Sequence, residues 1–234
     1  MGLPVYVYAK GKRPIGKGQE VWEWGVKVHP KVRAELMRRR ENRINQAHGA
    51  SGALPGRDAP ALETLTAQAL RFETGGGEPA ETCLAFAALQ VCWVRMSGAL
   101  EQPPAEKVSD RTGGCPVCGS PPVASVVHSE GSLAGTRFVV CSLCATEWHL
   151  VRIKCVNCHS TKGIGYLEVD GAGGVVKAET CDECRTYTKI IYTEKAPRAE
   201  AFADDLASLA LDVLVSEAGW QRAAPNPFLI PGDL

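Results

Sequence analysis

The feature that most constrains the fold is a series of four Cys-x-x-Cys pairs in the second half of the chain. The pairs are Cys115/Cys118, Cys141/Cys144, Cys155/Cys158 and Cys181/Cys184. Each cysteine of the first two pairs recurs 40 positions later, which indicates two copies of one small unit. A unit this short cannot bury enough apolar surface to fold unaided. The pattern therefore predicts a cross-link between the cysteines of each copy.

Metal binding is the favoured explanation for these cysteines. The N-terminus lacks a secretory signal and no apolar run could cross a bilayer, so we expect a cytoplasmic protein without membrane insertion. Disulfides are rare in that compartment, because it keeps thiols reduced. An iron–sulfur cluster and a thioredoxin-like redox pair are weaker alternatives, since the spacings are symmetric and no βαβ pattern surrounds them.

Four thiolates around a tetrahedral ion suit either zinc or iron without a cluster. We therefore expect two mononuclear ions, one in each copy, and the spacing leaves iron or zinc open. The predicted ligands are Cys115, Cys118, Cys141 and Cys144 for the first ion, and Cys155, Cys158, Cys181 and Cys184 for the second. Each site already has four sulfurs, so the nearby histidines 128, 149 and 159 are not expected to be ligands.

Inside the duplicated region the apolar pattern alternates, as in strands. Each copy is predicted to run as a Cys-x-x-Cys knuckle, a hairpin, a second knuckle and a returning strand. The predicted strands are 123–128, 136–140 and 147–153 in the first copy, and 164–169, 175–179 and 186–193 in the second. Glycine directly after a knuckle favours its tight turn, because glycine accepts a positive φ, but only Gly119 supplies one.

Helical patterns flank the duplicated region. They predict a short helix over 60–72, a largely buried helix over 79–100 and a last helix ending near Glu217. Cys83 and Cys92 lie outside the repeat and are interpreted as core thiols. In the last helix an apolar stripe is expected to dock on the core; its members are Phe202, Leu206, Leu209, Ala210 and Val213.

Together these patterns predict an α+β fold with a helical N-terminal part, two tandem rubredoxin-like or zinc-ribbon β modules, and a C-terminal helix. The expected divisions are a mainly helical region 1–112, a first four-cysteine module 113–153, a second module 154–195, and a helix with tail over 196–234. Residues 1–56 carry the weakest patterns, which predict a short strand at 5–8, a basic helix over 31–46 and a linker over 49–56.

Charge argues against nucleic acid as the partner of the cysteine modules. Residues 113–195 carry eight basic and eight acidic side chains, whereas residues 1–50 carry eleven basic against four acidic. A neutral module is a poor phosphate binder, so a zinc-ribbon nucleic-acid-binding protein is a minor alternative, supported only by the basic N-terminus. The chain also contains no recognisable nucleophile–base motif, so we do not expect an enzyme.

Residues outside the cysteines resemble one family. The stretches concerned are Cys115–Pro122, Cys141–Cys158, Glu179–Cys184 with Thr186 and Tyr187, Ala203–Leu209 and Asn226–Gly232. They are similar to the formate dehydrogenase accessory protein family FdhE over roughly residues 80–234. Two departures stand out. Arg185 occupies a position where the family tends to have glycine. Residues 1–56 do not resemble the family's longer N-terminal helical domain, so we expect a truncated, diverged or misassigned start.

The resemblance implies a non-catalytic, chaperone-like assembly factor for respiratory formate dehydrogenase. It would bind the catalytic subunit, including its twin-arginine signal region, in the cytoplasm before export. The same resemblance implies that the eight cysteines are ligands of rubredoxin-like sites that hold iron. A rubredoxin-like iron redox carrier is the alternative, because such a carrier would use the same four-sulfur sites.

Overall fold

The computed structural model describes residues 58–72, 79–100, 113–129 and 134–229, together with the backbone of two strands nearer the N-terminus. Those strands, β1 (Val7–Gly16) and β2 (Gln19–Val26), pair in antiparallel fashion. Strand β1 is therefore longer than the short strand expected at 5–8, and it pairs with a second strand that was not expected. The basic helix expected over 31–46 and the linker over 49–56 lie outside the described residues.

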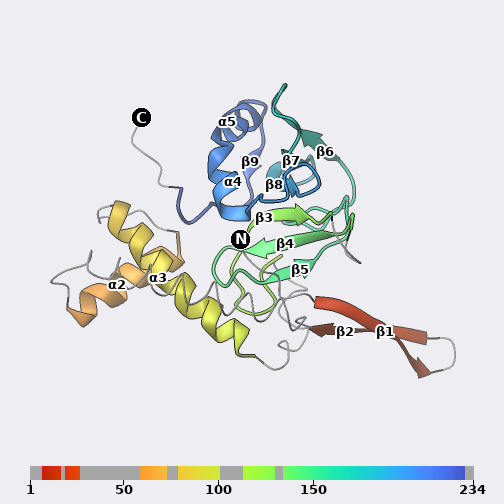
Figure 1. The fold of residues 1–234 in the computed structure, drawn as a ribbon, viewed down its shortest axis with the longest axis horizontal. Coiled ribbons are helices and arrows are strands. Elements are labelled where there is room, and N and C mark those ends of the chain that lie inside the picture. Colours follow the sequence, from red (N-terminus) through yellow and green to blue (C-terminus); the bar gives the residue numbers. More distant parts are fainter. Residues whose placement is uncertain are drawn as a thin grey trace.

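One mixed sheet carries both cysteine units (Figure 1). Its strands follow the order β5-β4-β3-β8-β7-β6, and β9 pairs with β8. Their bounds are β3 Pro122–Val127, β4 Arg137–Cys141, β5 Glu147–His149, β6 Ile164–Leu167, β7 Val176–Cys181, β8 Thr186–Tyr192 and β9 Gln221–Arg222. All six strands expected in the duplicated region are present, and the α+β class is confirmed.

The two units share this sheet, which their tandem order in the sequence did not predict. Strands within each unit pair in antiparallel fashion, whereas β3 of the first unit and β8 of the second are parallel neighbours. The returning strand of the first unit, β5, stops at His149 instead of the expected residue 153. The chain turns there and enters Ile153 with a φ of 59°, a conformation that ends a strand.

A buried ion pair fastens the units together across the sheet. The Arg137 guanidinium on β4 lies 2.6 Å from the Glu179 carboxylate on β7, and both side chains are almost fully buried. Arg137 also donates to the Ser125 hydroxyl and to the Lys154 carbonyl, at 2.9–3.1 Å, while the Tyr166 hydroxyl donates to Glu179. The polar groups of both side chains therefore have partners. Without such partners, burying the two charges would be strongly unfavourable.

Two helices lie beside the first unit. Helix α2 (Ala59–Leu70) begins at an Asp58 cap, whose carboxylate accepts a hydrogen bond from Ala61, and α3 (Pro79–Gly98) packs along it. The bounds of both match the expected helices closely, but the expectation that the second is largely buried was wrong, because only Ala85 and Phe86 are buried among the described residues of α3. The interpretation of both outlying cysteines as core thiols was wrong for Cys92, which is exposed on α3, whereas Cys83 is half-buried.

The C-terminal helix is broken in two. Helix α4 (Ala201–Ala207) and α5 (Leu209–Glu217) meet at Ser208. The buried Lys189 ammonium on β8 accounts for the break, because it donates to the carbonyls of Asp205 and Ser208 at 2.7 and 3.0 Å. A cation at a helix C-terminus is favourable, and here it takes carbonyls that a continuous helix would use itself.

Because of the break at Ser208, α5 packs on the sheet with a different face from the one predicted. The second half of the predicted apolar stripe was therefore wrong. Leu209, Ala210 and Val213 are exposed, and the side chains that α5 buries are Leu211 and Val215. The predicted stripe assumes one continuous helix, whereas a second helix starts at Leu209 and buries a different set of positions. The helices lie against the sheet face that carries Val126 and Ile191.

Candidate metal centres

The structure brings the eight predicted cysteines into two groups of four, in the pairing that the spacing predicts. Centre 1 is formed by Cys115, Cys118, Cys141 and Cys144, and centre 2 by Cys155, Cys158, Cys181 and Cys184. Within each group all sulfurs lie within 4.8 Å of one another. Both are clusters able to bind a metal ion, and none of the nearby histidines belongs to either.

The sulfur positions fit a tetrahedral ion. In centre 1 the Cys115 and Cys144 Sγ atoms lie 3.5 Å apart, and the Cys118 and Cys141 Sγ atoms lie 3.3 Å apart. The matching contacts in centre 2 are both 3.6 Å. Metal–sulfur bonds of about 2.3 Å place tetrahedral ligands about 3.8 Å apart, whereas a disulfide needs about 2.05 Å. The donor set is therefore suited to zinc or iron, either of which would act as a structural cross-link.

Backbone amides point at the sulfurs. Leu143 and Cys144 N–H donate to the Cys141 sulfur at 3.4 Å, and Val117 N–H donates to Cys115 at the same distance. In centre 2, Asn157 and Cys158 N–H donate to Cys155 at 3.3 and 3.4 Å. These dipoles stabilise negative charge on sulfur and so favour the thiolate forms that a metal needs.

Every knuckle ends in a residue of positive φ. The angles are 78° at Gly119, 53° at Ala145, 60° at His159 and 54° at Arg185. The turn that glycine would favour is thus formed at all four knuckles, although three of them lack glycine. A left-handed conformation costs a residue with a Cβ roughly 1–2 kcal/mol, so the convergence of the sulfurs has to offset that strain.

A threonine hydroxyl contacts the last sulfur of each centre. Thr146 Oγ1 lies 3.0 Å from Cys144 Sγ, and Thr186 Oγ1 lies 3.0 Å from Cys184 Sγ. These threonines are 40 positions apart and follow their cysteines by two residues, so the repeat itself held the signal that sequence reasoning missed. A hydroxyl that donates to a metal-bound thiolate orients it and spreads its charge.

Burial opposes loss of the thiol protons in the absence of a cation. It raises the pKa of Cys155 to about 12 and also raises the pKa of Cys181. In centre 1 the hydrogen bond with Cys115 is the largest of several causes that raise the pKa of Cys141. Burial is the largest single influence on Cys184 and acts in the same direction, but hydrogen bonds with Thr186, Cys158 and Cys155 together outweigh it and lower that pKa to about 6. A divalent cation supplies the charge that lets all four sulfurs ionise.

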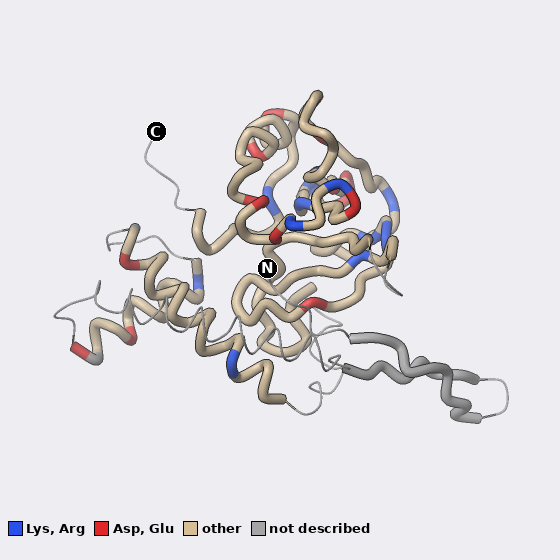
Figure 2. Tube along the Cα trace, in the orientation of Figure 1, with Lys and Arg blue, Asp and Glu red and all other residues tan. Residues whose placement is uncertain are grey.

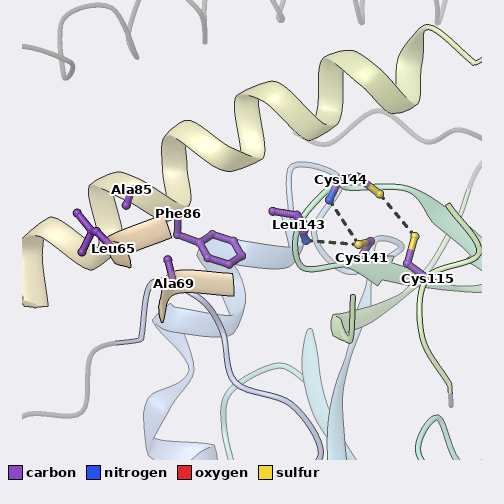
Figure 3. Packing of buried hydrophobic residues seen from close by; sticks show 8 residues of the cluster. All are labelled: Leu65, Ala69, Ala85, Phe86, Cys115, Cys141, Leu143 and Cys144. Carbon is purple, nitrogen blue, oxygen red and sulfur yellow. Dashed lines mark hydrogen bonds between the residues drawn. The ribbon is translucent and has the colours of Figure 1, made fainter. Parts of the chain in front are cut away.

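Centre 1 is enclosed by the N-terminal helices. Leu143, in its second knuckle, belongs to one buried cluster with Phe86 of α3 and Ala69 of α2 (Figure 3). Gln90 on α3 donates to the Ser142 carbonyl at 2.6 Å, and the Ser97 hydroxyl approaches the Cys144 carbonyl at 3.5 Å. Helix α3 therefore supplies hydrogen-bond donors to two backbone carbonyls of this knuckle and also covers it.

Centre 2 lies at the surface. Cys158 is exposed and Cys184 is half-buried, whereas centre 1 has three buried cysteines and one half-buried. The residues on either side of Cys184 in the last knuckle, Asp182, Glu183 and Arg185, are exposed as well. The duplicated sequence thus produces two equal sulfur clusters in unequal surroundings.

The comparisons with known proteins now identify the family. Residues 114–152 match the family model described as FdhE, central domain, and residues 153–229 match FdhE, C-terminal domain. The crystal structure of the FdhE protein from Pseudomonas aeruginosa is 31% identical, with a TM-score of 0.63 over 89% of this chain and 82% of that one. The chain belongs to the FdhE family.

Curated FdhE relatives agree in sequence. The FdhE homologue of Serratia proteamaculans is 43% identical over 172 residues, which are 74% of this chain and 55% of that protein. FdhE of Escherichia coli O1:K1 is 45% identical over 148 residues, 63% of this chain and 48% of that protein. The chain therefore spans about half the length of the curated FdhE proteins it matches. Both cysteine centres fall inside the matched domains.

Several other polar and aromatic residues have structural roles. They lie near the centres and in the C-terminal helices. Trp148 packs on the centre 1 cluster, and His128 pairs with Glu147 at 2.8 Å. Asp205 is fully buried among Lys189, Arg222 and Asn226, while the Asp204 carboxylate accepts from the Glu200 N–H at the start of α4. These two acids therefore act as a core anchor and a helix cap.

Two further observations bear on membrane and nucleic acid. No helix among the described residues is both long and apolar enough to span a bilayer. Basic and acidic positions both occur on the strands of the sheet, whereas α4 and α5 carry acidic residues and no Lys or Arg (Figure 2). The acidic C-terminal helices are therefore a poor surface for a phosphate backbone.

Proposed function

We propose that this chain is a non-catalytic accessory protein in the maturation of respiratory formate dehydrogenase. In this proposal it binds the catalytic subunit, including its twin-arginine signal region, in the cytoplasm before export. The observation that carries the proposal is the match to both FdhE domains, which covers residues 114–229 and both cysteine centres.

The chemistry of the centres supports a binding role over catalysis. Four thiolates fill a tetrahedral coordination sphere, so a bound ion keeps no open position for a substrate. In this proposal each group of four cysteines holds one iron or zinc ion, and the ion cross-links two knuckles and the hairpin between them. Binding of this kind contributes about 10 kcal/mol or more in zinc-finger peptides, enough to fix the shape of a surface.

A pull-down tests the proposed partner. Tagged full chain would be incubated with a formate dehydrogenase catalytic subunit that retains its signal region, and the full-length FdhE of Escherichia coli would serve as the positive control. We expect both proteins to retain the subunit, and the metal-stripped chain to lose it. Retention by the longer relative but not by this chain would refute the partner assignment here.

A second function has one observation in its favour. The exposed Cys158 places a sulfur ligand of centre 2 at the surface, where an electron could pass to a partner, as a rubredoxin-like carrier requires. Such a carrier needs iron that cycles between two oxidation states. A visible absorbance that bleaches with dithionite and returns in air would support this function, and a colourless zinc-loaded protein would eliminate it.

A further inference from the structure

A ten-residue strap (residues 220–229) leaves centre 2 and ends on the helices that enclose centre 1. At its start the Arg185 guanidinium, directly after the last knuckle of centre 2, lies 5.6 Å from the ring centroid of Trp220. The Gln221 N–H donates to the Arg185 carbonyl at 2.9 Å, and β9 then pairs with the first residues of β8. The strap therefore begins on the backbone of the knuckle itself.

The middle of the strap is held by buried polar contacts. Arg222 forms an ion pair with Asp212 at 3.0 Å and also reaches Asp205. Asn226 is buried, and its amide donates to the Asp205 carboxylate at 2.8 Å and to the Phe202 carbonyl at 3.1 Å. These contacts keep the strap in one position relative to α4 and α5, so a displacement at one end is carried along it.

The far end of the strap reaches the N-terminal helices. The Phe228 ring meets Phe86 of α3 edge-on at 6.0 Å, and it also contacts Phe202 of α4 at 6.1 Å. Phe86 is buried in the same cluster as Leu143 and Cys144 of centre 1. A continuous series of contacts thus joins Arg185 beside centre 2 to the helix that covers centre 1.

We propose that the metal occupancy of centre 2 controls how firmly helix α3 is held over centre 1, and that the strap transmits this effect. Centre 2 is the exposed centre, so it is the one that releases its ion first. Loss of that ion frees the last knuckle, in which Arg185 has a strained positive φ of 54°, and the start of the strap loosens with it. Phe228 then binds Phe86 less firmly. The inference rests on the cysteines being metal ligands and not on the identity of the partner.

Hydrogen exchange on the full metal-loaded chain tests the proposal. The variant Cys158→Ser disables centre 2 at its exposed ligand, and Cys92→Ser, an exposed cysteine outside both centres, is the matched control. We expect Cys158→Ser to speed exchange in residues 220–229 and in α3 by about three- to tenfold, the range that corresponds to one aromatic pair. Unchanged exchange in α3, with centre 2 shown by metal analysis to be empty, would overturn the proposal.

Breaking the strap at its far end tests the route. Phe228→Ala is expected to speed exchange in α3 by a similar factor while centre 2 keeps its ion. Adding Cys158→Ser to Phe228→Ala should then change α3 no further, whereas additive effects would show that the signal does not pass through Phe228. If Cys158→Ser does not fold, one equivalent of a chelator chosen for the metal that elemental analysis finds, added to the parent chain, gives the same comparison.

Discussion

The two metal centres share a sequence pattern and differ in what surrounds them. Each has the same spacing, an equivalent amide-to-sulfur hydrogen bond in its first knuckle and the same threonine contact. Centre 1 lies beneath α3 and contributes to a hydrophobic cluster, whereas centre 2 faces the surface and anchors the C-terminal strap. The difference shows that the repeat fixes the chemistry of a centre, while the segments packed on it set its exposure.

Removal of metal is the change with the largest expected effect. Loss of both ions should cost about 10 kcal/mol or more of folding free energy per centre and unfold the knuckles and hairpins. Near-ultraviolet circular dichroism during chelation should fall in two steps, the faster one from centre 2. A single step, with both ions leaving together, would contradict the inequality of the centres.

Removing one charge of the buried ion pair between Arg137 and Glu179 should destabilise both cysteine units to the same extent. Glu179→Gln leaves the Arg137 guanidinium buried without its counter-ion, so we expect a loss of about 3–5 kcal/mol in urea unfolding. The double variant Arg137→Met/Glu179→Leu should recover most of that loss, because no unpaired charge remains. Destabilisation of one unit only would show that the shared sheet does not couple the units.

The threonine pair offers a matched test of the two centres. Thr146→Val and Thr186→Val each remove one hydroxyl from a sulfur at 3.0 Å, and each should weaken metal affinity about tenfold in a competitive chelator titration. Because centre 1 is the more buried, the loss of metal affinity on Thr146→Val should equal or exceed the loss on Thr186→Val. Serine at the same positions should restore the affinity, which separates the hydroxyl from the packing.

The smallest expected effects are at the positive-φ knuckle residues. Ala145→Gly relieves the strain at a φ of 53° and should stabilise the chain by about 1 kcal/mol. Arg185→Gly relieves similar strain but loses the contact with Trp220, so thermal unfolding should show a smaller gain or none. Equal gains at both positions would mean that the Arg185 contact contributes nothing.

Much of this structure could be predicted from local pattern. The alternating segments gave six strands within a few residues of their bounds, and the Cys-x-x-Cys spacing gave both four-cysteine groups. The threonines that contact the sulfurs repeat at the same interval and could have been found in the same way. These features are local, because each depends on residues of one copy.

The features that could not be predicted depend on contacts between distant segments. The parallel pairing of β3 with β8 and the ion pair between Arg137 and Glu179 join separate copies. The break at Ser208 depends on Lys189, which lies in another strand. Gln90, which donates to the Ser142 carbonyl, lies on a helix outside the repeat. No periodicity in the sequence encodes such pairs.

The metal content of single-ligand variants tests the central claim most directly. Elemental analysis of the purified full chain should give two ions, and Cys118→Ser and Cys158→Ser should each give one. The visible spectrum of the same samples would identify iron if it is present. A parent chain with fewer than two ions, or variants that keep both, would contradict the account of two separate four-sulfur centres.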